Sequence, residues 1–194
     1  MGKHGILKGL SLSKQLSFTA VFAALCCVST LVFTVPLPAS GYFNTGDVFV
    51  LLSAWFLGPL FGAVAAGVGS ALADVFSGFA LYAPATLIIK ACMAFVAYLV
   101  WAFFKKLIKK DAIDFLPRAL SAILAETIMV AGYFTFECVL YGLAGGAANM
   151  LGNTLQGVYC LCLATALCAS LYPIKPLQRT FPFLTISKKH QAHS

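Results

Sequence analysis

The sequence has few charged residues and little of what soluble enzymes rely on. Only 10% of its 194 residues are Asp, Glu, Lys or Arg, whereas a soluble domain typically has about 25%. It contains no Walker A motif and no HExxH motif, and its three histidines lie close to the chain ends, at His4, His190 and His193. These absences argue against ATP hydrolysis and metalloprotease chemistry, so we expect no enzyme activity and no cofactor.

What the chain has instead is long apolar sequence. Hydrophobic residues make up 61% of it, and the mean hydropathy is +0.93. Five segments are apolar enough to lie in a bilayer: residues 16–35, 48–77, 82–104, 116–140 and 150–172. No small-residue cleavage site followed by a soluble domain comes after the first segment, so we expect no cleavable signal peptide.

The distribution of lysine and arginine predicts the topology. Basic residues lie in the N-terminal tail, in the KKLIKK stretch that begins at Lys105 with Arg118 after it, and in the C-terminal tail. The remaining predicted loops, residues 36–47, 78–81 and 141–149, contain none and are expected on the outer side. The positive-inside rule therefore places both tails and the KKLIKK stretch in the cytoplasm. The net charge of +7 follows from this topology and does not call for a nucleic-acid partner.

This topology requires an even number of crossings before Lys105. Residues 48–77 must then form two helices, and Gly58-Pro59 marks where one ends and the next begins. The first is short, so we leave open whether it spans fully. The prediction is an all-α integral membrane protein, a six-helix bundle with both termini inside. A single membrane domain at 16–173 lies between cytoplasmic tails at 1–15 and 174–194.

The seven cysteines all lie within apolar segments: Cys26, Cys27, Cys92, Cys138, Cys160, Cys162 and Cys168. We interpret them as small buried hydrophobic residues rather than disulfides or metal ligands. Cys160 and Cys162 are spaced CxC, but no histidine or second cysteine pair accompanies them. No metal site is expected.

Ionisable side chains are retained inside the apolar segments, at Asp47, Asp74, Lys90, Glu126 and Glu137. A charge at bilayer depth costs at least about 2.5 kcal/mol, which favours a functional explanation. In the predicted topology the polar groups converge on the outer half of the membrane, where we expect a pocket for a small planar polar solute. Its predicted lining is Tyr42, Phe43, Asn44, Asp47, Asp74, Tyr82, Lys90, Tyr133, Glu137, Asn149, Asn153 and Gln156.

Purely structural interpretations of these residues remain open. Asp74 and Lys90 flank one short outer turn and suit pairing with each other. Asn149 suits capping of the last helix, and the tyrosines at helix ends suit an interfacial belt. Glu126 lies deeper and is as suited to bonding a neighbouring helix as to touching a ligand.

Small residues recur at helical spacing in two segments. Residues 60–77 carry a row of glycines and alanines that we expect to pack within the bundle. The first segment has Ala20 and Ala24 in a small-xxx-small pattern. Because this segment has few internal charges, it is suited to presenting these alanines to a partner chain.

Residues 41–90 contain four distinctive elements: the FNTGD loop at 43–47, the LGP turn at 57–59, the small-residue helix that ends at Ala73-Asp74, and the YAPAT run from Tyr82. In these elements the chain resembles the S components of energy-coupling factor (ECF) vitamin importers. The resemblance is closest to the branch with riboflavin-type and hydroxymethylpyrimidine- or pyridoxine-type S components. Chain length, helix number and inside termini also fit.

The resemblance implies a protein of the prokaryotic plasma membrane that binds a vitamin at its outer face with high affinity. It implies a transmembrane coupling subunit and two ATP-hydrolysing subunits as partners, with release of the cargo inside by toppling in the bilayer. Ala20 and Ala24 resemble the family's contact with the coupling subunit. We expect hydroxymethylpyrimidine or a vitamin B6 form as substrate, because the likeness is closest to that branch.

Other functions remain as alternatives. One is a riboflavin-specific S component. Another is an autonomous secondary transporter that uses the buried carboxylates as proton relays, although no internal repeat typical of such carriers is visible. A membrane scaffold without a ligand would leave the outer polar cluster unexplained.

Overall fold

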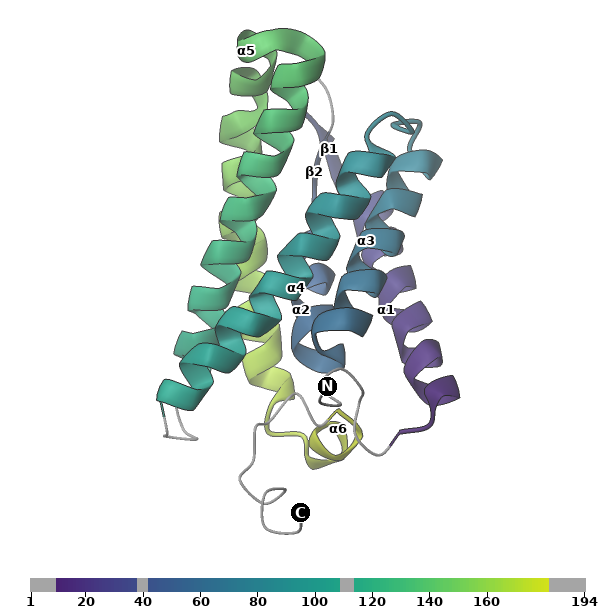
Figure 1. Cartoon of the computed structure of the whole chain (residues 1–194), viewed down its shortest axis with the longest axis vertical. Helices are drawn as coiled ribbons and strands as arrows, with labels where there is room; N and C mark the ends of the chain where they lie inside the picture. The colour runs from purple at the N-terminus through teal and green to yellow at the C-terminus, as the bar shows by residue number, and fades with distance from the viewer. Residues whose placement is uncertain (1–9, 38–41, 109–113, 182–194) are drawn as a thin grey trace, which may run out of the picture.

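Helices dominate the structure, with one short hairpin between the first two (Figure 1). The computed structural model describes residues 10–37, 42–108 and 114–181. The strands β1 (Thr34–Pro36) and β2 (Tyr42–Asn44) pair antiparallel. Within the described ranges the helices are α1 (Leu12–Val32), α2 (Gly46–Leu57), α3 (Pro59–Phe76), α4 (Ala83–Leu107), α5 (Phe115–Leu171) and α6 (Lys175–Thr180).

Four of these helices, α1, α3, α4 and α5, are each long and apolar enough to cross a membrane. The prediction of a helical membrane protein is confirmed. The predicted tails are partly helical, because α1 begins at Leu12 and α6 lies beyond residue 174.

α5 is a pair of antiparallel helices rather than one rod. A straight helix of its 57 residues would be about 85 Å long, far more than a bilayer core of about 30 Å. Gly142 interrupts it with φ 75° and ψ 176°, a backbone conformation that glycine adopts without strain. The chain folds back at the top of Figure 1, so that Gly157 lies against Glu126. We call residues 115–141 the first leg and residues 143–171 the second leg.

The predicted outer loop at 141–149 is therefore wrong in its extent. Only Gly142 leaves the helical conformation, and the helix resumes directly after it. The segment contains three alanines, which are strong helix formers, and no proline. One glycine with positive φ is enough to reverse the chain.

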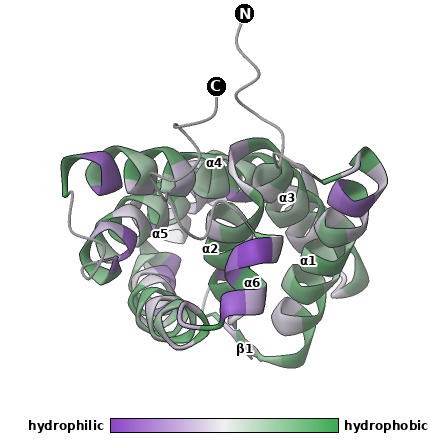
Figure 2. Ribbon diagram, turned by 90° about the horizontal axis from the view of Figure 1, so that it is seen from below, coloured by the Kyte–Doolittle hydropathy of each residue, from purple (hydrophilic) through white to green (hydrophobic). Residues whose placement is uncertain are grey.

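The predicted break at Gly58-Pro59 is confirmed. α2 ends at Leu57, Gly58 has a φ of 83°, and Pro59 opens α3. The 12 residues of α2 are about 18 Å long, too short to span a bilayer core of about 30 Å. All of its residues except Phe49 are buried, and it contacts α1, α3, α4 and α5. Figure 2 shows it among these longer helices, so α2 is a central core helix.

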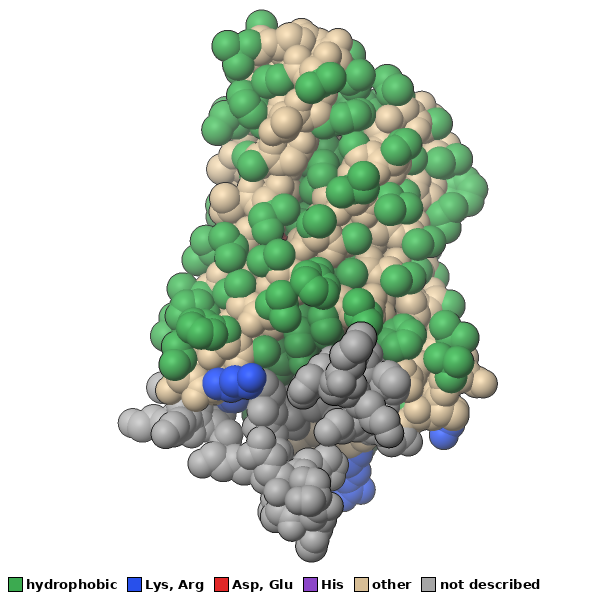
Figure 3. Space-filling view, in the orientation of Figure 1, with side chains coloured by type: hydrophobic (Ala, Val, Ile, Leu, Met, Phe, Trp, Pro, Cys, Tyr) green, Lys and Arg blue, Asp and Glu red, His purple; other side chains and the backbone are tan. Residues whose placement is uncertain are grey.

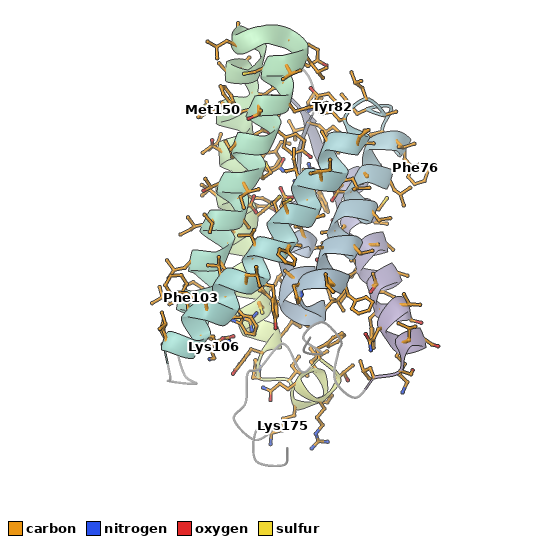
Figure 4. The ribbon with its side chains drawn as sticks, viewed as in Figure 1. Phe76, Tyr82, Phe103, Lys106, Met150 and Lys175 are labelled. Carbon is orange, nitrogen blue, oxygen red and sulfur yellow. The ribbon has the colours of Figure 1, made fainter. Side chains whose placement is uncertain are left out.

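The surface of the bundle is apolar along its length. Figure 3 shows hydrophobic side chains over most of the visible face, with lysine and arginine confined to the lower end. Lys106 and Lys175 lie at that end, and Tyr82 lies towards the other (Figure 4). This arrangement agrees with the predicted orientation, so we call the lysine-bearing end inner and the opposite end outer. Lys109 and Lys110 of the KKLIKK stretch lie outside the described residues.

Glycines on α3 let neighbouring helices approach closely, as the sequence pattern predicts. A Cβ atom on Gly69 would overlap the carbonyl oxygen of Ala23 on α1. One on Gly62 would lie 2.8 Å from the carbonyl oxygen of Ser53 on α2, and Gly67 is similarly close to α4. α3 therefore packs through its small residues inside the bundle.

An ionic and aromatic cluster fills the inner end. Arg118 donates from Nε to Asp114 Oδ2 at 2.6 Å, and Lys105 Nζ lies 3.2 Å from Asp114 Oδ1. The guanidinium carbon of Arg118 lies 4.8 Å from the centroid of Trp101 and 5.3 Å from that of Trp55, which are cation–π distances. We call these five residues the inner cluster. Lys105 and Arg118, expected as loop charges, are in fact buried.

Candidate functional site

A small polar cavity lies in the outer half of the bundle. Its volume is about 30 Å³, which is room for a water molecule or two. We call it the outer cavity. Its walls come from Leu37 just after β1, from β2, from the α3–α4 turn and from α3, α4 and both legs of α5. The lining residues are Leu37, Tyr42, Asn44, Asp74, Phe79, Tyr82, Thr86, Tyr133, Glu137, Asn153 and Gln156.

A hydrogen-bonded network supports the cavity from deeper in the bundle. Lys90 on α4 donates to Oδ1 of Asp47, which lies in the first turn of α2. Gln156 Nε2 donates to the other carboxylate oxygen, Asp47 Oδ2, at 2.6 Å. Gln156 Oε1 accepts from the backbone N–H of Asn44 at 2.8 Å. Lys90 Nζ also lies 5.3 Å from the centroid of the Tyr133 ring. This network fixes β2, α2, α4 and the second leg relative to one another, and it pairs the buried Lys90 and Asp47 charges.

Glu137 forms one wall from the first leg and is 2% exposed. Its Oε1 accepts from Asn149 Nδ2 at 2.9 Å and from the Tyr82 hydroxyl at 3.4 Å. Its Oε2 is buried and has no hydrogen-bond partner among the described residues. Buried polar atoms are nearly always paired, so this oxygen stands out as an acceptor open to a donor.

Asp74 and aromatic rings form the opposite wall. The Tyr42 hydroxyl donates to Asp74 Oδ1 at 2.6 Å. Burial and the adjacent Asp74 carboxylate raise the pKa of Tyr42, so its phenol remains a hydrogen-bond donor at any physiological pH. The ring centroids of Tyr42 and Phe79 are 5.1 Å apart, and those of Phe79 and Tyr82 are 6.1 Å apart. The wall thus combines flat apolar faces with phenolic donors.

Most of the predicted lining residues do line the outer cavity: Tyr42, Asn44, Asp74, Tyr82, Tyr133, Glu137, Asn153 and Gln156. Three predicted residues lie outside the lining and contact lining residues instead: Asp47 accepts from Gln156, Lys90 lies over the ring of Tyr133, and Asn149 donates to Glu137. Phe43 points elsewhere and packs on Tyr159, with ring centroids 5.8 Å apart.

Leu37, Phe79 and Thr86 line the cavity but were missed from the sequence. Thr86 lies one helical turn after Tyr82 in the YAPAT run, a spacing that predicts one shared face. Leu37 and Phe79 lie in apolar connections without such a signal.

Several structural interpretations need correction. Lys90 pairs with Asp47 rather than with Asp74, because α2 lies inside the bundle beside α4. Asn149 is not a helix cap, since the second leg is already helical from residue 143 and Asn149 bonds Glu137. Neither carboxylate oxygen of Glu126 has a hydrogen-bond partner among the described residues. Among the cysteines, Cys92 and Cys162 are exposed, not buried.

A second, larger cleft of about 450 Å³ lies between the two legs of α5. Its walls are apolar apart from Glu126 and two threonines. Ile123, Met150 and Val158 on its rim are exposed on the surface that would face lipid. A polar solute fits the outer cavity better, because polar groups from several elements converge there.

Ala20 and Ala24 lie on the exposed side of α1, away from the cavity. Ala23, between them in sequence, instead faces α3, where Gly69 packs on it. The small-residue pair is therefore open to a partner, while the internal contact uses a different alanine.

Comparisons with known proteins agree with this architecture. The family model for the ECF-type riboflavin transporter S component matches residues 11–173. An uncharacterized protein in the gap 3′ region of Pyrococcus woesei is 37% identical over 132 residues, which cover 68% of this chain and 83% of that protein. The thiamine precursor transporter HmpT of Lactococcus lactis subsp. cremoris is 26% identical over 156 residues, which cover 79% of this chain and 85% of that protein.

The family match includes the membrane helices α1 to α5 and every residue that lines the outer cavity. The chain is thus a substrate-binding component for vitamin uptake across the cell membrane, and not an enzyme. It belongs to the ECF-type riboflavin transporter S component family.

Proposed function

We propose that this chain captures hydroxymethylpyrimidine or a vitamin B6 form in the outer cavity. Delivery inward then takes place with an ECF module made of a transmembrane coupling subunit and two ATP-hydrolysing subunits. The observation that carries the proposal is the convergence of aromatic rings, amides and carboxylates from β2, α3, α4 and both legs of α5 on one outer cavity.

The chemistry of the lining supports a small planar heterocycle. Tyr42, Phe79 and Tyr82 supply ring faces, and Asn153 and Glu137 supply groups that hydrogen-bond the edge of a ring. A volume of about 30 Å³ is below that of any vitamin, so binding requires the walls to move apart. The movement required is smaller for one ring than for the three fused rings of a flavin.

The relative HmpT adds independent support, since it is named a thiamine precursor transporter and shares 26% identity over most of both chains. Riboflavin is the second candidate, because the matching family model is that of riboflavin transporter S components. The two substrates differ so much in size that direct binding distinguishes them.

Binding to the purified, detergent-solubilised chain tests the proposal. We expect mass spectrometry of co-purifying small molecules to find a single-ring vitamin or precursor. In calorimetric titrations hydroxymethylpyrimidine or a B6 vitamer should bind more tightly than riboflavin. Co-purification of riboflavin, with no binding of the single-ring compounds, would replace the proposed substrate.

Uptake assays test the proposed partners. Uptake of the labelled vitamin should disappear in cells that lack the ECF ATPase subunits. Persistent uptake in those cells would favour an autonomous secondary transporter, in which Asp47, Glu126 and Glu137 become candidate proton carriers.

A further inference from the structure

Two carboxyl groups of the outer cavity, Glu137 and Asp74, each have one buried oxygen without a hydrogen-bond partner among the described residues, and Glu137 is the one whose other oxygen accepts from two side chains. One carboxylate oxygen of Glu137, Oε1, is already satisfied by Asn149 Nδ2 and the Tyr82 hydroxyl. The other, Oε2, is buried and has no partner among the described residues, and Glu137 lines the cavity. Leaving a buried acceptor unpaired is unfavourable, so the site gains most from a ligand that donates a hydrogen bond at this point.

The rest of the described lining favours the same kind of ligand. It includes two carboxylates, Asp74 and Glu137, but no lysine, arginine or histidine. The nearby cation, Lys90, lies outside the lining and is held by Asp47. The phenolic donors of Tyr42 and Tyr82 already donate to the two carboxyl groups. The carboxyl groups therefore leave acceptor oxygens for the ligand, and the cavity favours donor groups over acceptors or anions.

We propose that Glu137 Oε2 accepts a hydrogen bond from an exocyclic amine on the ring of the substrate. Glu137 is then the residue that selects aminopyrimidines over oxopyrimidines. This inference rests on the proposed function, in which the cavity binds a single-ring vitamin precursor. An amine at this position donates to Oε2. A ring carbonyl in the same place would set an acceptor against the carboxylate and leave both oxygens unpaired.

The fixed partners of Oε1 make the effect of Glu137→Gln predictable. Asn149 and Tyr82 both donate, so they require the carbonyl oxygen of the glutamine amide to take the place of Oε1. The amide nitrogen then replaces Oε2 and faces the ligand as a donor. The variant should repel an amine and accept a carbonyl, which reverses the preference without changing the size of the side chain.

The experiment compares two probes, 4-amino-5-hydroxymethyl-2-methylpyrimidine and its 4-oxo counterpart, by calorimetric titration of the full chain. The unaltered protein should bind the amino probe at least about tenfold more tightly, the effect of one buried hydrogen bond. Glu137→Gln should lower or invert that ratio. Glu126→Gln is the matched control, because Glu126 is also a buried carboxyl of the first leg but does not line the outer cavity. It should leave the ratio unchanged.

The possible outcomes separate the two proposals. An unchanged ratio in folded Glu137→Gln, or equal binding of both probes by the unaltered protein, would overturn the role of Glu137 and leave the proposed function standing. Binding of neither probe by the unaltered, folded protein would overturn hydroxymethylpyrimidine as the substrate, and the selectivity for aminopyrimidines with it, and would leave a vitamin B6 form as the proposed substrate. Thermal unfolding of each variant confirms that a change in binding is not a loss of fold.

Discussion

Two buried carboxyl groups on the same leg of α5, Glu126 and Glu137, differ in their hydrogen-bond partners. Glu137 is held by Asn149 and Tyr82, whereas Glu126 has no hydrogen-bond partner among the described residues for either oxygen. Both side chains are at least nine-tenths buried. Their sequence context is equally apolar, so only the packing of neighbouring helices distinguishes them.

The first prediction follows from this contrast. Glu126→Met should raise the free energy of unfolding by about 1 to 3 kcal/mol, because it replaces an unpaired buried carboxyl with an apolar side chain of similar size. Glu137→Met should lower it, because Asn149 and Tyr82 would lose their acceptor. Thermal unfolding in one detergent measures both. A marked loss of stability in Glu126→Met would mean that the carboxyl has a structural partner.

The pair of Lys90 and Asp47 supplies a second prediction at this scale. Lys90→Met alone should destabilise the protein by about 3 to 5 kcal/mol, because it leaves Asp47 as an uncompensated buried charge. Adding Asp47→Asn should recover most of that loss, since an amide can still accept from Gln156. If the double variant is no more stable than the single one, the two residues are not coupled in the way that their contact implies.

At the scale of helices, α1 has one side that packs on α3 inside the bundle and another side that is exposed. Ala23 packs against Gly69 of α3, whereas Ala20 and Ala24 are exposed. None of the described residues of α1 lines the outer cavity. Ligand binding and association with a coupling subunit should therefore respond to different substitutions on the same helix.

The third prediction tests this separation. Ala20→Trp with Ala24→Trp should preserve vitamin binding but abolish association with the coupling subunit, because bulky side chains hold partner helices apart. Ala23→Trp is the matched control, and it should damage folding and binding together by pushing α1 away from α3. Thermal stability, ligand affinity and co-purification of the coupling subunit are measured on the same samples. Normal transport by the double variant would exclude a partner contact at these alanines.

The positions of the helices were largely predictable from the sequence, whereas the side-chain contacts between different helices were not. Apolar length and the Gly58-Pro59 break located α2, α3 and α4 to within a few residues, because membrane helices are set by local composition. The pairing of Lys90 with Asp47 required knowing that α2 lies buried in the bundle. The inner cluster was invisible for the same reason, since Arg118 and Trp55 meet only after folding.

For the whole molecule, the exposed lysines and the outer cavity lie at opposite ends, which indicates the end that we expect to meet the vitamin. Exposed lysines such as Lys106 and Lys175 lie at one end, and Tyr82 of the cavity lies towards the other. The orientation then follows from the preference of cytoplasmic loops for positive charge.

The fourth prediction tests that orientation by cysteine labelling in a cysteine-free background. Leu107→Cys, at an exposed position on the inner end, should be inaccessible to an impermeant thiol reagent added outside intact cells. Ala80→Cys, exposed in the α3–α4 turn at the outer end, is the matched control and should be labelled. External labelling at position 107 would contradict the predicted topology.

The inner cluster has a further consequence for energetics. Trp55, Trp101 and Arg118 are buried and packed together at the base of the bundle, so these side chains fill the inner end of the protein. In the proposed function the vitamin then enters and leaves on one side only, and occupancy of the cavity follows the vitamin concentration on the side that the cavity faces. Accumulation against a gradient would require work on the orientation of the whole chain, and in the proposed function the coupling module supplies that work.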